Sequence, residues 1–168
     1  MGLKELDVAP PQHVIEAAII VLGDAFEIDD PGDVAQRLLA IVGGDVDAAG
    51  LEKDLREAAN SAASDVVALV KLVLAVDEPS IASQARVRSA VEMAGRKQLV
   101  VTPEMVYYCA ALAVYAVAML RNPKKSSEET ITIEDDPKGR KKIVIKKAET
   151  YLDPFSPLAK VIERILKG

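Results

Sequence analysis

Residues 105–120 contain no charged side chain, and this run constrains the fold more than any other feature of the chain. As a helix it would span roughly 24 Å, which is shorter than the hydrocarbon core of a bilayer at about 30 Å. It also carries Tyr107, Tyr108 and Tyr115 in place of a leucine-rich lipid face. We therefore predict the central helix of a bundle, buried on most sides, and we expect no membrane span.

The residues before this run repeat apolar side chains at helical spacing, interrupted by proline, glycine and acidic residues. Pro10-Pro11 is expected to open the first helix and Gly23 to end it. Residues 66–76 are nearly all apolar and are also compatible with a buried strand, but their length favours a helix. One unbroken helix over 48–76 is the alternative. The apolar stripes of the predicted helices cover 14–22, 34–42, 51–62, 66–76, 81–94 and 105–120.

The composition changes after Asn122, where a polar linker leads into two short segments that alternate with period two. Residues 130–134 and 142–146 alternate in the way that strands do, and 135–140 between them are rich in turn-forming residues. The pattern predicts a β-hairpin. Four isoleucines are expected on one face of it: Ile131, Ile133, Ile143 and Ile145.

A last helix is predicted after Ser156-Pro157, with an apolar stripe on one side and charged residues on the other. The fold class is therefore mainly α. We expect a compact five- or six-helix bundle over residues 1–121. A β-hairpin and a C-terminal amphipathic helix follow it within residues 122–168.

The isoleucine face of the hairpin needs cover, because an isolated two-stranded hairpin is at best marginally stable. Either the hairpin and last helix dock on their own bundle, or the hairpin pairs with a second chain, as a homo-oligomer or with another protein. We favour a non-enzymatic protein–protein interaction module, an adaptor or assembly domain. The expected contact surface comprises Ile131, Ile133, Ile143, Ile145, Leu158, Ile162 and Ile165.

Basic residues gather around the hairpin, although the whole chain has a net charge of −5 and an isoelectric point near 5.0. Six acids surround the cluster and no aromatic residue is interleaved for base stacking, so nucleic-acid binding is disfavoured but kept as an alternative. The candidates for anion contact are Lys138, Arg140, Lys141, Lys142, Lys146 and Lys147.

Local motifs for catalysis or metal binding are missing from the sequence. The chain has a single histidine, His13, and a single cysteine, Cys109, which stands in the most apolar predicted helix. A reactive thiolate needs an accessible, electropositive site, and a zinc or di-iron centre of the common types needs more than one imidazole or thiolate. We therefore expect no catalytic residue, metal or cofactor. A small-molecule pocket inside the bundle remains a second alternative.

The start of the chain resembles neither a signal peptide nor a myristoylation site. Acids occupy the region where a basic n-region would stand, and Leu6 takes the place of the required serine or threonine. One cysteine also gives no disulfide framework. These features predict a reducing, cytoplasmic setting.

Overall fold

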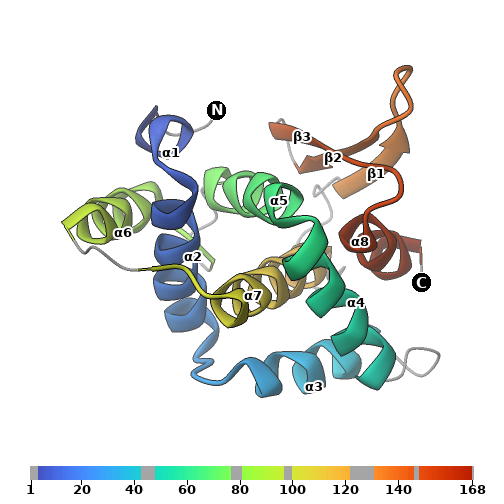
Figure 1. Ribbon diagram of the computed structural model, residues 1–168, viewed down its shortest axis with the longest axis horizontal. Helices are drawn as coiled ribbons and strands as arrows, with labels where there is room; N and C mark the ends of the chain where they lie inside the picture. Colours follow the sequence, from blue (N-terminus) through green and yellow to red (C-terminus); the bar gives the residue numbers. More distant parts are fainter. Residues whose placement is uncertain are drawn as a thin grey trace.

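The computed structural model describes residues 4–42, 48–76, 81–96, 100–121, 131–145 and 148–167. Within these ranges the chain is mainly helical, with a small antiparallel sheet between the seventh helix and the last one (Figure 1). The predicted fold class, a helical bundle followed by β structure and a C-terminal helix, is therefore confirmed.

The helices that precede the sheet are α1 (Lys4–Val8), α2 (Pro11–Phe26), α3 (Pro31–Val42), α4 (Ala48–Ser61), α5 (Ala63–Ala75), α6 (Gln84–Arg96) and α7 (Pro103–Arg121). They are followed by the strands β1 (Ile131–Asp135), β2 (Lys141–Ile145) and β3 (Ala148–Leu152), and then by helix α8 (Pro157–Lys167). The short helix α1 was not expected from the sequence.

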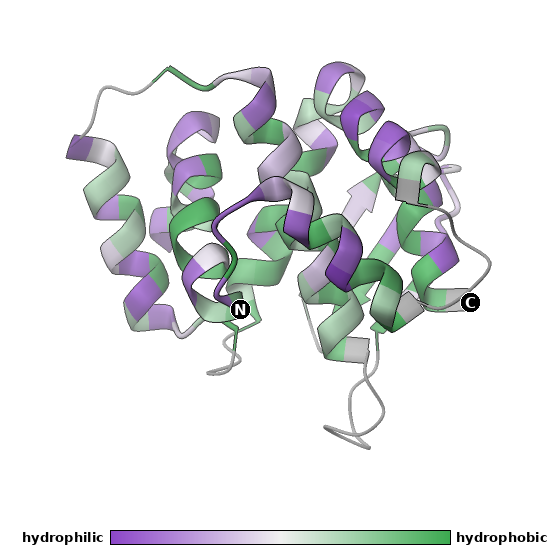
Figure 2. Cartoon of the chain, turned by 90° about the horizontal axis from the view of Figure 1, so that it is seen from below, coloured by the Kyte–Doolittle hydropathy of each residue, from purple (hydrophilic) through white to green (hydrophobic). Residues whose placement is uncertain are grey.

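Helix α7 is the centre of the bundle, as the uncharged run predicted. It packs against α2, α3, α4, α5 and α8, and every side chain from 109 to 118 is buried. Thr102 caps its first turn, where the backbone N–H of Met105 donates to Thr102 Oγ1 at 3.2 Å. Pro103–Leu120 is long and apolar enough to cross a membrane, but 72% of this segment is buried inside the protein. Hydrophobic residues gather where the helices meet, and hydrophilic residues lie on their outer sides (Figure 2).

The expected end of α2 at Gly23 is wrong, because the helix continues to Phe26. It ends at Glu27, whose φ of 55° is left-handed, and the N–H of Ile28 donates to the carbonyl of Gly23 at 2.9 Å. Gly23 serves another purpose: a Cβ there would lie 3.2 Å from the carbonyl oxygen of Ile28, which is a tight contact. The glycine thus permits a close approach within the helix end and does not stop the helix.

The alternative of one unbroken helix over 48–76 is also wrong. The chain breaks at Ala62, and the helices on either side meet at 105°. Helix α4 packs on α7 and α8, whereas α5 packs on α2, α7 and β3, so each half buries its own apolar face. The apolar stretch 66–76 was predicted to be a helix and not a strand, and the structure confirms this: it lies in α5, with Val76 as the C-cap.

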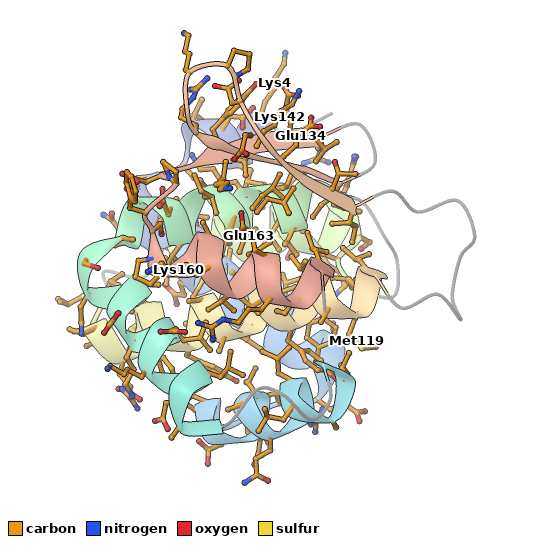
Figure 3. The ribbon with its side chains drawn as sticks, turned by 90° about the vertical axis from the view of Figure 1, so that its right-hand side faces the viewer. Lys4, Met119, Glu134, Lys142, Lys160 and Glu163 are labelled. Atoms are coloured by element: carbon orange, nitrogen blue, oxygen red, sulfur yellow. The ribbon has the colours of Figure 1, made fainter. Side chains whose placement is uncertain are left out.

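The sheet has the order β1-β2-β3, so the predicted hairpin gains a third strand. Ile131 pairs with Ile145 and Ile133 pairs with Ile143, which places the four isoleucines on one face. Gly139 sits in the connecting turn at φ 85°, a conformation that favours glycine. The inner face of the sheet lies over α5 and α8 (Figures 1 and 3).

Helix α8 closes the lower side of the sheet and joins it to the bundle. Its Ser156 cap is present, since Ser156 Oγ accepts the N–H of Leu158 at 3.2 Å. An ion pair of 2.7 Å links Arg164 of α8 to Asp54 of α4. The C-terminal segment therefore packs on the bundle of its own chain.

Candidate functional site

The residues predicted as a contact surface lie largely inside the protein. Five of them are at most 4% exposed: Ile143, Ile145, Leu158, Ile162 and Ile165. Ile131 and Ile133 are half-buried and pack against the same core. The fold therefore uses these apolar side chains internally, and a surface for a partner has to be sought elsewhere on the sheet.

The predicted anion contacts are largely neutralised by acids of the same chain. Lys141 Nζ lies 2.7 Å from Asp135 and 2.6 Å from Glu163 of α8, and both hydrogen bonds raise the pKa of the lysine. This lysine joins β1, β2 and α8 at the end of the sheet. Its charge is already compensated where a phosphate would have to approach.

The outer face of the sheet carries a compact network of opposite charges. Lys142 Nζ lies 3.2 Å from Glu149 and 3.9 Å from Glu134, on the two neighbouring strands. The Tyr151 hydroxyl donates to Glu149 at 3.1 Å, and the Arg140 guanidinium stacks over the Tyr151 ring at 4.1 Å. Lys142 and Glu134 stand on the outer side of the sheet, and Glu163 lies below it on α8 (Figure 3).

The remaining members of the basic cluster lie at the turn and after β2. Arg140 is paired with Asp136 at 3.0 Å. Lys138 is exposed at the tip of the turn. Lys146 and Lys147 lie outside the described residues. The structure thus brings the cluster together with acids, which leaves little net positive field for nucleic acid.

The two side chains considered for catalysis lie on helices α7 and α2. Cys109 is completely buried in α7, and this burial raises the pKa of its thiol well above the usual range. His13 is half-buried beside Gly95 of α6. Among the described residues, no three His, Cys, Asp or Glu side chains are grouped closely enough to hold a metal ion.

A groove runs along α5 beside strand β3, and sequence reasoning missed it. Its volume is about 570 Å³, within the range of ligand and peptide sites. The α5 side is largely apolar and runs from Ser64 to Ala75, and strand β3 contributes Ala148, Glu149 and Thr150. The lining comprises Asp7, Ser64, Val67, Ala68, Lys71, Leu72, Ala75, Ala148, Glu149 and Thr150.

Strand β3 forms the wall of this groove as an edge strand. Within the described sheet it pairs with β2 alone, and its residues Ala148, Glu149 and Thr150 line the groove. An edge strand carries backbone N–H and C=O groups that have no partner strand. Natural edges are often protected by lysine or proline, and Ala148–Leu152 contains neither.

Within the part of the chain that the structure describes, Lys71 is the one basic residue that lines the groove. Among the described residues it has no ion pair and no side-chain hydrogen bond. Glu149, on the strand side, is held by Lys142 and Tyr151. The sequence does mark Lys71, because it is the single charged residue in the apolar run 66–76. No pattern in the sequence indicates which residues of other segments lie near it.

A second hollow, between α2 and the loop after it, has a volume of about 520 Å³, and its lining includes the acids Asp24, Glu27 and Asp29. One of them, Asp24, is paired with Arg86 of α6. The Tyr108 hydroxyl, which also lines it, donates to the carbonyl of Ile28 at 2.7 Å. These groups already have partners within the chain, so the α5–β3 groove is the stronger candidate site.

Comparison of the chain with protein families, with curated proteins and with solved structures found no match. The function therefore has to be inferred from the geometry of this chain.

Proposed function

We propose that this protein is a non-enzymatic protein–protein interaction module that binds an extended segment of its partner in the α5–β3 groove. The observation that supports this proposal is the position of β3, an edge strand that lines a groove whose α5 side is largely apolar. An extended peptide adds to such an edge through main-chain hydrogen bonds, and its alternate side chains enter the groove beside it.

The dimensions of the two walls agree with this mode of binding. From Ser64 to Ala75 the helix rises by about 17 Å at 1.5 Å per residue. From Ala148 to Leu152, strand β3 extends by about 13 Å at 3.3–3.4 Å per residue. A partner segment of about five residues therefore fits along both walls at once.

The interaction hypothesis is kept from the sequence, but its contact surface changes. Ile143, Ile145 and the stripe of α8 are packed in the core, and Ile131 and Ile133 are half-buried against it, so these side chains offer little surface to a partner. A role in nucleic-acid binding has less support, because Arg140, Lys141 and Lys142 are each paired with acids. Strand addition needs neither the isoleucines nor the lysines.

Selection from a phage-displayed library of random dodecapeptides tests this function. We expect enriched peptides whose fluorescein-labelled synthetic forms bind the full chain and shift the amide NMR signals of Ala148, Glu149 and Thr150. Ala68 is half-buried and lines the groove beside β3. Ala68→Gln should therefore weaken peptide binding at least about tenfold, because the longer side chain fills the groove. Ala85→Gln is the matched control, since Ala85 is an exposed helical alanine on α6 and its replacement should leave binding unchanged.

Three results would contradict the proposal. The first is a library that yields no enrichment over a blank surface. The second is a set of selected peptides that shifts the amide signals of β1 and leaves those of β3 in place. The third is equal binding by the Ala68→Gln and Ala85→Gln variants.

A further inference from the structure

We infer that the partner segment carries an aspartate or glutamate side chain that pairs with Lys71 in the middle of the α5–β3 groove. This inference rests on the proposed function and adds the chemistry of the partner to it. It starts from the charges of the groove, where the ammonium group of Lys71 has no partner of its own among the described residues.

The position of Lys71 sets where the carboxylate must stand in the peptide. The lining of α5 continues on both sides of it, to Ser64 in one direction and Ala75 in the other. A peptide that follows the groove therefore passes Lys71 and continues. This geometry calls for an acidic side chain within the segment and not for a carboxylate at its end.

The neighbours of Lys71 predict the residues beside the acid. Val67 and Ala75 lie four residues before and after it, so each is about 6 Å away along the helix. In an extended peptide, side chains on the same face are two residues apart and separated by roughly 7 Å. Small apolar residues two positions before and after the acid would therefore rest on Val67 and Ala75.

The acids of the groove limit the peptide to one negative charge at this face. Asp7 of α1 lines the groove together with Glu149 of the strand, and Glu149 is already engaged by Lys142 and Tyr151. A second acid in the peptide would meet like charge there. The expected pattern is a small apolar residue, any residue, an acid, any residue and a small apolar residue.

A charge exchange on peptides selected from the random library tests this inference. Lys71→Glu should weaken the selected peptide at least about tenfold, and replacing the acid of the peptide by lysine should restore binding to the Lys71→Glu protein. Lys160→Glu on α8, an exposed lysine away from the groove, should leave binding unchanged (Figure 3). Circular dichroism of both variants controls for folding.

The outcomes separate this inference from the proposed function. Peptides that shift the β3 amides but share no acid overturn the inference and leave the function standing. The same holds for peptides that bind only through a free terminal carboxylate and are lost on amidation. Failure to shift the β3 amides at all overturns both. A dimer detected by light scattering, together with a shift of the β3 amide signals on dimerisation, would replace the acidic partner with a second copy of this chain.

Discussion

Replacement of Ile143 by alanine is expected to lower the free energy of unfolding by about 2–5 kcal/mol, as large-to-small changes in packed cores do. Ile143 is 0% exposed and lies in β2, the central strand of the sheet. Its side chain packs within the same core cluster as Leu112 of α7. Urea unfolding followed by circular dichroism of the helices measures the effect, because a sheet that belongs to the core unfolds with the bundle.

Val144→Ala is the matched control for this prediction. Val144 follows Ile143 in the same strand but lies on the outer face, half-buried beside Thr132 and Glu149. Both changes replace a β-branched residue by alanine, so their loss of strand propensity is similar. We expect a cost of about 1 kcal/mol or less for Val144. Equal small costs at both positions, with no change in the helical transition, would show that the sheet does not support the bundle.

The thiol of Cys109 is expected to react with a disulfide reagent at least about a thousandfold more slowly than an exposed thiol. Cys109 is completely buried in α7, and burial also raises its pKa, so both access and the thiolate form are suppressed. Modification of the thiol then requires unfolding. The free energy of unfolding, at least about 5 kcal/mol, determines how much more slowly the buried thiol reacts than an exposed one. Absorbance at pH 8 with Ellman's reagent gives the rate.

A variant with Ser89→Cys supplies the control within the same molecule. Ser89 is exposed on α6, so the new thiol should react in a fast phase and Cys109 in a slow one of equal amplitude. The slow phase should accelerate in urea as unfolding becomes more frequent. A fast reaction of both thiols in the absence of urea would mean that α7 is not the buried centre of the protein.

The sequence predicted those elements whose pattern depends on local periodicity. The uncharged run 105–120 indicated α7, and the alternation around Ile133 and Ile143 indicated two strands and the face they share. These predictions were correct because the side of a helix or strand that is buried determines the spacing of its apolar residues in the sequence.

Other features depend on contacts that no local pattern records. Strand β3 has Ala148 and Thr150 on its inner face, so its alternation is weak, and pairing with β2 defines it. Helix α2 ends at Glu27, which adopts a left-handed conformation where glycine is usual. A prediction that relies on glycine therefore places the end of this helix too early, at Gly23.

The candidate groove was not predictable because its walls are distant in the sequence. It joins Asp7, one side of α5 and residues 148–150 of β3, and none of these segments carries a binding motif. Lys71 was visible as a single charge in an apolar helix. Only the fold shows that Lys71 lines a groove together with residues of an edge strand.

Amide hydrogen exchange of the wild-type chain, followed by mass spectrometry, tests most directly whether the sheet is built into the core and leaves one edge for a partner. We predict that fragments covering 141–145 stay protected as long as those covering 109–118, since both should exchange only on global unfolding. Fragments of β3 should exchange faster, because one edge of this strand has no partner strand among the described residues. Complete exchange of 141–145 within minutes, while 109–118 remains protected, would contradict this account.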